Sequence, residues 1–289
     1  MTNTSTFEAL RRPGTSNAAA EPDVSDALTE RSRRVWGAGD YDRISAGFRE
    51  GAEWFVARRS FQPRQIVLDV ACGSGNLTIP AARTKAYVTG LDLVPSLLAK
   101  AELWARSEGL SVALDEGNAE DLPYADAQFD VVMSMFGVMF AARPEKVVAE
   151  LARVTRPGGQ VVLANWTRSA FIGKMLAMHV ARVAPPAGVP SPLAWADEEV
   201  LRSRFDERTW RLTTTVRALT FRYPYSPAGT AELFRAAYGP TVRTFEALDE
   251  NQRALFAEEL AAHWTAHNRA GDGSTEVEAE YLEVLAVRR

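Results

Sequence analysis

Cysteine and long apolar runs are scarce in this sequence. Its 289 residues include one cysteine, Cys72, which excludes an internal disulfide framework and fits a reducing compartment. The longest apolar-rich run, residues 131–142, has 12 residues and is too short to span a bilayer. The N-terminus also lacks the basic-then-apolar pattern of a secretory signal. We therefore expect a cytoplasmic protein that does not insert into membranes.

An excess of basic residues is absent as well. The chain carries 33 Lys and Arg residues against 37 Asp and Glu residues, a formal net charge of −4 at pH 7. This balance gives no general electrostatic attraction to nucleic acid or to anionic lipid. We expect no nucleic-acid partner.

Histidine is rare too, with three residues in the chain. His263 and His267 are four residues apart, so one face of a helix would present both of them. Trp264, however, stands where the zinc-protease motif has its glutamate, and no third ligand is evident from the sequence. We expect no metal site.

The composition is that of an ordinary soluble globular protein, with 46% hydrophobic and 24% charged residues. Residues 1–30 are rich in Thr, Ser, Asn, Ala, Pro and Glu and show no periodic apolar face. Such a segment predicts a flexible tail. We expect residues 31–289 to form a single domain, and a homo-oligomer is an open alternative to a monomer.

Residues 66–76 have the pattern of a buried strand, a glycine turn and the start of a helix. The strand is a nearly continuous apolar run, which is typical of a parallel strand covered on both faces, and Asp69 lies near its end. Gly73 and Gly75 allow a tight turn and leave room for a ligand against the backbone. The next helix points its free N–H groups into the same turn. The stretch therefore predicts a site for a nucleoside cofactor at the carboxyl end of the strand.

Two classes of cofactor compete for this site. A dinucleotide fold requires a third glycine, but Thr78 stands at that position. The carboxylate of Asp69 would also lie near the phosphates of a dinucleotide, whereas a ligand with an ammonium and a sulfonium group tolerates it far better. A nicotinamide-dependent oxidoreductase remains the alternative among enzymes.

A second acid follows the next strand. Residues 87–92 read as a strand that ends at Asp92, 17 residues after Gly75. A carboxylate at about this spacing reaches the ribose hydroxyls of a nucleotide. A structural role as the cap of the helix that Pro95 opens is the alternative, and ribose binding is favoured because a strand precedes the acid.

Several ordered motifs resemble those of class I S-adenosylmethionine-dependent methyltransferases, especially the branch that modifies quinones and secondary metabolites. The pattern Asp69-x-x-x-Gly73-x-Gly75 resembles their first motif, and residues 116–123 resemble the third. The Pro-Gly-Gly turn at 157–159 and the strand after it also match. The resemblance spans about residues 36–170. It implies S-adenosyl-L-methionine as the cofactor and S-adenosyl-L-homocysteine as the product.

Strand and helix patterns alternate through this region, which predicts a parallel sheet with helices on both faces. We predict strands at 66–70, 87–92, 112–114, 129–135 and 160–165, followed by strand patterns at 211–223 and 277–287. The family topology implies that the last two form an antiparallel edge. The predicted fold is therefore α/β and doubly wound, with a mostly parallel seven-stranded sheet of the Rossmann-like methyltransferase type and a helical lid. The lid segments are expected near 183–208 and 227–270.

The resemblance, together with the positions of the strand ends, gives a set of cofactor-binding candidates. In the family, a side chain at the place of Asn118 meets the exocyclic amine of adenine, although many members carry Asp there. An aromatic residue of the N-terminal helix often lines the site, which suggests Tyr41, and simple packing of Tyr41 and Trp36 is an equal alternative. The full set is Tyr41, Asp69, Ala71, Gly73, Gly75, Asp92, Leu93, Asn118, Ala119, Ser134 and Phe136.

The expected acceptor is a small hydrophobic or aromatic metabolite. Large apolar side chains follow the central strand at 129–135 and could form the wall of a pocket there, although such residues more often belong to the core. The substrate-binding candidates are Phe136, Met139, Phe140 and Trp166. No catalytic base is evident, and the candidates are His179 and Tyr238.

The sequence thus favours an enzyme that moves a methyl group by in-line displacement, a reaction in which positioning supplies much of the acceleration. A binding protein that keeps the fold without turnover is a third hypothesis. The intact acids and glycines of residues 69–92 argue against it.

Overall fold

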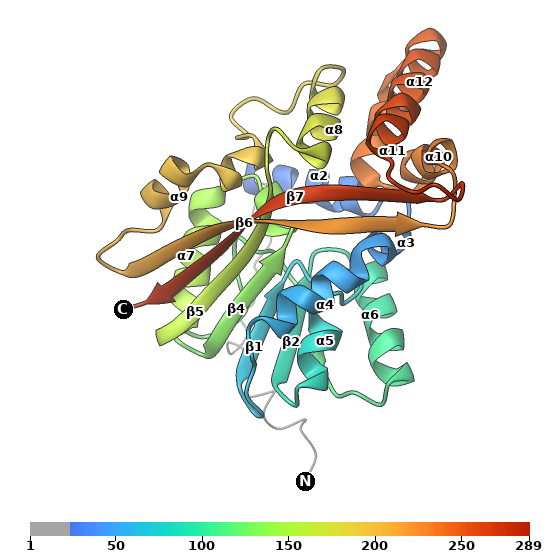
Figure 1. Ribbon diagram of the computed structural model, residues 1–289. Helices are drawn as coiled ribbons and strands as arrows, with labels where there is room; N and C mark the ends of the chain where they lie inside the picture. Colours follow the sequence, from blue (N-terminus) through green and yellow to red (C-terminus); the bar gives the residue numbers. More distant parts are fainter. Residues whose placement is uncertain (1–23) are drawn as a thin grey trace.

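The computed structural model describes residues 24–289, and a twisted seven-stranded sheet forms its centre (Figure 1). The strand order is β3-β2-β1-β4-β5-β7-β6, in which β7 runs antiparallel to both of its neighbours and the other neighbouring pairs are parallel. The strands are β1 (Ile66–Val70), β2 (Tyr87–Asp92), β3 (Ala113–Glu116), β4 (Phe129–Met135), β5 (Thr155–Trp166), β6 (Trp210–Tyr223) and β7 (Thr275–Arg288). The predicted α/β fold with an antiparallel edge is confirmed.

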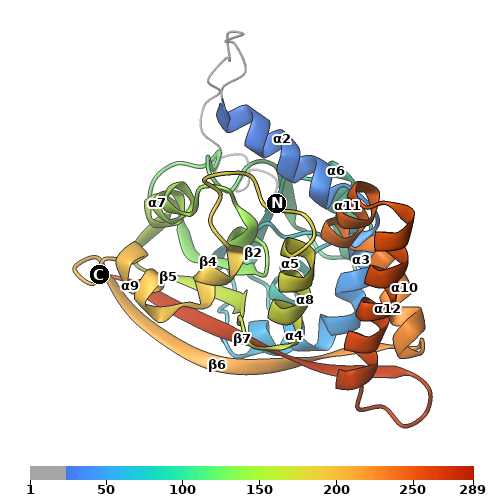
Figure 2. The ribbon, with the colours of Figure 1, turned by 90° about the horizontal axis from the view of Figure 1, so that it is seen from above.

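Helices cover both faces of this sheet (Figures 1 and 2). The α-helices described are α2 (Val24–Trp36), α3 (Tyr41–Ser45), α4 (Arg49–Ala57), α5 (Thr78–Arg83), α6 (Pro95–Ser107), α7 (Pro144–Val154), α8 (Phe171–Val180), α9 (Glu198–Arg204), α10 (Pro227–Ala237), α11 (Gly239–Ala247) and α12 (Glu250–His267). Three short 3₁₀ helices join them, η1 (Ala46–Phe48), η2 (Val138–Phe140) and η3 (Pro192–Ala196). Among the described residues, no helix combines the length and apolar character needed to cross a membrane.

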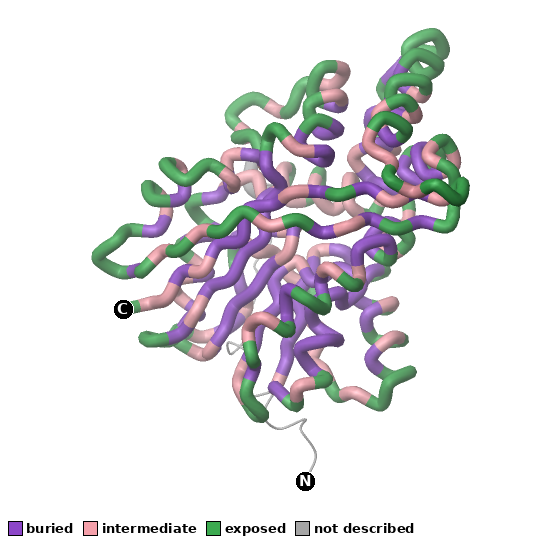
Figure 3. The backbone as a smooth tube through the Cα atoms, in the orientation of Figure 1, coloured by how far each residue is buried: buried purple, intermediate pink, exposed green. Residues whose placement is uncertain are grey.

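The central strands are buried because both of their faces are covered. Val67 and Leu68 of β1 have no exposed surface, and Leu68 lies between Thr89 of β2 and Val132 of β4. Figure 3 shows the same concentration of buried residues along the central strands. This apolar layer fixes the carboxyl ends of the parallel strands at one edge of the sheet, where α2 and α3 pass over them (Figure 2).

The N-terminal expectation is wrong in part. The tail was expected to extend to residue 30, but α2 begins at Val24, and residues 1–23 lie outside the part of the chain described. Leu28, Ser32 and Trp36 are spaced four residues apart, which places them on one face of this helix. The polar composition of this segment gave no clear helical signal, and the inner face of α2 borders a cavity.

The other boundaries differ in detail. The segment between α2 and β1 is divided into α3, η1 and α4, and Gly37 and Gly39 separate these elements from α2. The expected lid segment 227–270 is likewise divided, into α10, α11 and α12. There, the side chain of Asp249 accepts a hydrogen bond from the backbone N–H of Gln252 in a capping box, so a new helix, α12, starts at this point.

A buried ion cluster attaches the end of α4 to the antiparallel edge. The carboxylate of Glu283 on β7 is 5% exposed and accepts hydrogen bonds from Arg58 and Arg59, each at 2.7 Å. Arg217 of β6 forms a third ion pair with it at 3.1 Å. Burial alone would raise the pKa of Glu283, but the arginines outweigh it and hold the pKa below its usual range.

We expect Glu283→Gln to lower the free energy of unfolding at pH 7 by about 2–4 kcal/mol, because it leaves the arginine charges without a counter-charge. A depressed carboxyl pKa stabilises the folded state above the unfolded pKa, and this contribution disappears as pH falls. The difference between variant and wild type should therefore shrink below about pH 4. Urea unfolding at pH 7 and pH 3 measures both effects.

Glu278→Gln is the matched control. Its ion pair with Arg269 on the surface has side chains 48% and 61% exposed, so the expected change is below about 0.5 kcal/mol. Equal losses in the two variants would show that the cluster around Glu283 has no special role.

Candidate functional site

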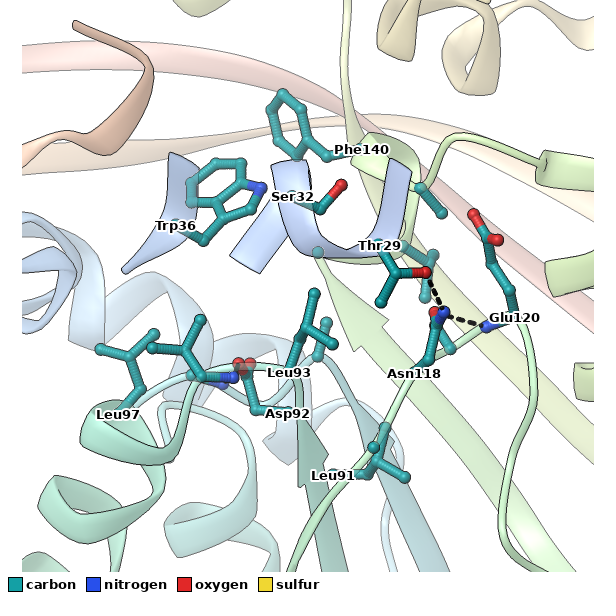
Figure 4. Close-up of a pocket in the computed structure, with 18 of the residues that line it drawn as sticks. Thr29, Ser32, Trp36, Leu91, Asp92, Leu93, Leu97, Asn118, Glu120 and Phe140 are labelled. Atoms are coloured by element: carbon teal, nitrogen blue, oxygen red, sulfur yellow. Dashed lines mark hydrogen bonds between the residues drawn. The ribbon is translucent and has the colours of Figure 1, made fainter. Parts of the chain in front are cut away.

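A cavity opens at the carboxyl ends of β1, β2 and β4 (Figure 4). It encloses about 840 Å³ of space, part of which is open to solvent. A smaller cavity of about 340 Å³ lies beside it, and Tyr41, Ala71, Gly73 and Met135 line both of them. The strand ends therefore converge on two adjoining cavities that share these four residues.

Asp92, the last residue of β2, lies in the wall of the larger cavity. Its side chain accepts hydrogen bonds from the backbone N–H of Gly73 at 2.8 Å and of Val94 at 2.9 Å. Burial raises its pKa, and the backbone N–H groups oppose that shift. Val94 is the N-cap residue of α6, so this bond fixes the chain just before the helix, and Asp92 is not itself the cap of α6. The carboxylate thus ties the glycine turn to α6 and borders the cavity.

Asp69 borders the smaller cavity and is 1% exposed. The Thr78 hydroxyl donates a hydrogen bond to it at 2.6 Å. Burial raises the pKa of Asp69 to about 7, the nearby Asp92 adds to this, and the Thr78 bond opposes it. Among the described residues, no cationic side chain pairs with Asp69. The buried Oδ1 of Asn76 in the same cavity lacks a hydrogen-bond partner, so this end presents unmatched acceptor oxygens.

The two glycines of the turn have different roles. A Cβ added at Gly73 would meet only Tyr41, at 3.8 Å, so this position faces open space. A Cβ added at Gly75 would lie 3.1 Å from Ile79 and 3.3 Å from Ala101, and Gly75 lines neither cavity. Both glycines were expected to make room for a ligand, but Gly75 instead allows α5 and α6 to pack closely.

The far end of the larger cavity is a slot with mostly apolar walls, and Leu93, Asn118 and Ala119 line it as expected. The side-chain oxygen of Asn118 accepts a hydrogen bond from the N–H of Glu120 at 3.0 Å, and its amide group donates to Thr29 of α2 at 2.9 Å (Figure 4). Asn118 therefore holds its own loop in place and also contacts the helix that covers the slot.

The end of β4 approaches the end of β1 closely. Phe136 and Ala71 both have positive φ values, +59° and +57°, which are strained for residues with a Cβ. A Cβ at Gly137 would lie 2.5 Å from that of Ala71, so only glycine fits between the two strand ends. This backbone arrangement directs Phe136 into the cavity wall.

Three other residues expected near this strand end do not line either cavity. Trp166 lies behind Phe136, with the two rings stacked 3.4 Å apart, and Met139 is 1% exposed within the core. The hydroxyl of Ser134 is fully buried and accepts a hydrogen bond from the N–H of Val138. All three residues lie near the carboxyl ends of the strands, where the cavity opens. Successive side chains of a strand point to opposite faces of the sheet, and those of Trp166 and Ser134 point away from the cavity.

The candidates for a catalytic base also lie outside the cavities. His179 Nδ1 donates to the carbonyl of Met175 at 2.7 Å, and Nε2 accepts from the Thr241 hydroxyl at 2.8 Å. Burial lowers the pKa of His179 to about 4, so it is a neutral link between α8 and α11. Burial raises the pKa of Tyr238 above its usual range. Neither residue lines the cavities, the Nε2 of His179 is occupied by Thr241, and the Tyr238 hydroxyl stays protonated, so neither is placed to act as a base.

Sequence reasoning missed the contribution of α2. Leu28, Thr29, Ser32 and Trp36 of this helix line the larger cavity (Figure 4). Their spacing of three and four residues was the available signal. Residues 183–208 and 227–270, which were expected to be a lid, line neither cavity, although Tyr238 packs directly against Trp36 and Tyr41. In the described residues, no group of three or more His, Cys, Asp or Glu side chains could hold a metal ion.

Comparisons with known proteins agree with this geometry. Residues 68–163 match the family model described as a methyltransferase domain. An uncharacterized protein of Mycobacterium tuberculosis H37Rv is 36% identical over 225 residues, which are 77% of this chain and 82% of that protein. The demethylmenaquinone methyltransferase of Deinococcus radiodurans is 34% identical over 191 residues, which are 63% of this chain and 77% of that enzyme.

Among solved structures, the YcgJ protein of Bacillus subtilis shares the fold, with a TM-score of 0.56 at 16% sequence identity. The match covers 83% of this chain and 99% of that protein. Together with the strand order and the match of the family model, these similarities lead to one assignment. The chain belongs to the class I S-adenosylmethionine-dependent methyltransferases, and S-adenosyl-L-methionine is its cofactor.

Proposed function

We propose that the protein transfers the methyl group of S-adenosyl-L-methionine to a small hydrophobic or aromatic metabolite by in-line displacement. One observation carries the proposal. Two buried carboxylates, Asp69 and Asp92, end neighbouring strands and border the two adjoining cavities, and no cationic side chain of the described residues pairs with either. A cationic cofactor supplies the missing positive charge.

The residues present fit this cofactor from end to end. Asp92 would accept the ribose hydroxyls, and the slot with Leu93, Asn118 and Ala119 would hold the adenine. At the other end, Asp69 and the unpartnered Oδ1 of Asn76 would accept the ammonium group. A nicotinamide dinucleotide fits less well, because its pyrophosphate would lie near the Asp69 carboxylate instead of meeting helix N–H groups alone.

The bound cofactor supplies an activated methyl group with a neutral leaving group. The chain contributes orientation and exclusion of water. Phe136 and the strained backbone at the end of β4 form a rigid wall, and α2 covers the cavity from the other side. Among the described side chains that line the larger cavity, none is positioned to accept a proton at neutral pH. The carboxylate of Glu120 is bound by Arg143, and that of Asp92 is held by backbone N–H groups. The acceptor must therefore bring an atom that is already nucleophilic.

The wall opposite the carboxylates supports an apolar acceptor. Met135, Phe136, Val138 and Phe140 line that part of the cavity, and they carry no charge. The relative in Deinococcus radiodurans is named for demethylmenaquinone, which is an acceptor of this apolar, ring-bearing kind. These observations favour a hydrophobic small molecule over a charged one.

The cofactor class is tested by isothermal titration calorimetry on the full chain. We expect S-adenosyl-L-homocysteine to bind with a dissociation constant in the micromolar range or below, and NAD(H) not to bind detectably. Tight binding of NAD(H) without binding of S-adenosyl-L-homocysteine would overturn the proposal. Cofactor binding with no methylated product across a panel of apolar acceptors would instead support a binding protein without turnover.

Asp92→Ala is expected to weaken binding of S-adenosyl-L-homocysteine by about 1–3 kcal/mol, because the ribose hydroxyls lose their acceptor. Calorimetry measures the change directly. Asp126→Ala is a matched control, since the Asp126 carboxylate is 78% exposed in a surface ion pair with Arg153. An unchanged dissociation constant for Asp92→Ala would show that the ribose is held elsewhere.

Cofactor affinity should depend on pH through Asp69. Above its pKa of about 7 the carboxylate is ionised and ready to accept the ammonium group, whereas below it the carboxyl must first lose a proton. The association constant for S-adenosyl-L-homocysteine should therefore fall by up to about tenfold per pH unit below pH 7. Asp69→Asn should bind more weakly at pH 8 and lose this dependence. A flat profile for the wild type from pH 5.5 to pH 8 would contradict the assignment.

A further inference from the structure

Trp36 occupies a space enclosed by three other aromatic rings. The indole, at the end of α2, packs edge-on against Tyr41 of α3 at 5.6 Å between ring centroids, Phe140 of η2 at 4.8 Å and Tyr238 at 5.9 Å. Figure 4 shows Trp36 beside Phe140, with Asp92 lower in the view, and both Trp36 and Asp92 line the larger cavity. Four elements far apart in the sequence thus meet around one ring, next to the residues that we assign to the cofactor.

The backbone around Trp36 is fixed, whereas no hydrogen bond within the described part of the chain holds its side chain. The N–H of Asp40 donates to the carbonyl of Ala237 at 3.0 Å, and a Cβ at Gly239 would lie 2.0 Å from the carbonyl oxygen of Val35. These close approaches leave no room for the backbone to slide. The indole is only half-buried, so rotation of the side chain is the movement that the packing allows.

The enclosure suits an uncharged flat ring. Its three walls are aromatic and present edges and faces at contact distance, as they do to the indole now. Within residues 24–289 neither the Tyr41 hydroxyl nor the Tyr238 hydroxyl forms a hydrogen bond, although each ring is packed. Burial keeps both hydroxyls protonated at neutral pH, so they can donate hydrogen bonds to an oxygen on a ring that enters.

Resting on the proposed function, we propose that the space among Tyr41, Phe140 and Tyr238 is the acceptor subsite for an uncharged aromatic ring that carries an oxygen. Trp36 fills this subsite until the ring of the acceptor replaces its indole. Trp36 therefore acts as a gatekeeper, and Tyr238 brings the lid segment 227–270 into contact with the acceptor. The acceptor binds only when the indole has rotated out. Its apparent association constant is therefore the intrinsic constant multiplied by the fraction of protein molecules in which the subsite is open.

The test measures the dissociation constant of 2-naphthol, as an uncharged ring probe, by equilibrium dialysis with the full chain saturated with S-adenosyl-L-homocysteine. Trp36→Ala removes the competing indole, so 2-naphthol should bind at least about tenfold more tightly than to the wild type. Trp36→Phe should give an intermediate gain. The cationic 2-naphthylmethylammonium should bind more weakly than 2-naphthol to each form.

Trp54→Ala is the matched control, because Trp54 of α4 is 62% exposed and lies outside both cavities. It should leave the affinity for 2-naphthol unchanged. An unchanged or weaker affinity in Trp36→Ala would overturn the gatekeeper role, since the indole would then be a wall of the site or irrelevant to it. Preferred binding of the ammonium probe would overturn the uncharged class.

A second readout follows the indole itself. In protein labelled with 5-fluorotryptophan, Trp36→Phe identifies the fluorine resonance of Trp36 among the seven tryptophans. Addition of 2-naphthol should shift that resonance toward the position of an exposed indole and leave the resonance of Trp54 in place. No shift at saturating probe would contradict displacement. Failure of wild type and Trp36→Ala alike to bind S-adenosyl-L-homocysteine would refute the proposed function instead, so the two failures are distinguishable.

Discussion

The site depends on two carboxylates that are buried at neighbouring strand ends without a compensating cation. Asp92 is held by backbone N–H groups of the glycine turn and of the start of α6, and Asp69 by the hydroxyl of Thr78. Burial of an unpaired charge is costly, and the raised pKa of both groups expresses that cost. The fold supports this arrangement because the apolar central strands fix the position of each strand end. A cationic ligand relieves the imbalance.

The sequence predicted the parallel core well for a physical reason. The buried strands read as short apolar runs, and glycines and acids mark their carboxyl ends, so β1, β2 and β4 have the predicted bounds. Strand patterns at 211–223 and 277–287 located the edge strands β6 and β7, whereas their antiparallel pairing came from the family resemblance and not from the pattern itself. Topology then brought Asp69, Gly73, Asp92 and Asn118 together, as expected for strand ends that share one edge of the sheet.

Other parts of the site could not be read in this way. The predicted strand β5 indicates that Trp166 lies at its carboxyl end. It does not indicate that the ring of Trp166 stacks behind Phe136 instead of facing the cavity. The helix α2 was missed because its inner face mixes the apolar Leu28 and Trp36 with polar residues, so its helical spacing gives only a weak apolar stripe. His179 is ordinary in the sequence, and only tertiary packing between α8 and α11 shows that it is a neutral structural link.

The charge state of Asp69 in the free and bound protein tests the account most directly. In protein labelled with ¹³C at the aspartate carboxyl carbons, Asp69 is assigned with Asp69→Asn and titrated by NMR. We expect its pKa to be about 7 in the free protein and to fall well below that once S-adenosyl-L-homocysteine is bound, because the ammonium group favours the ionised form. A free pKa near that of an ordinary aspartate, or a pKa that the ligand does not change, would contradict the claim that an uncompensated carboxylate selects the cofactor.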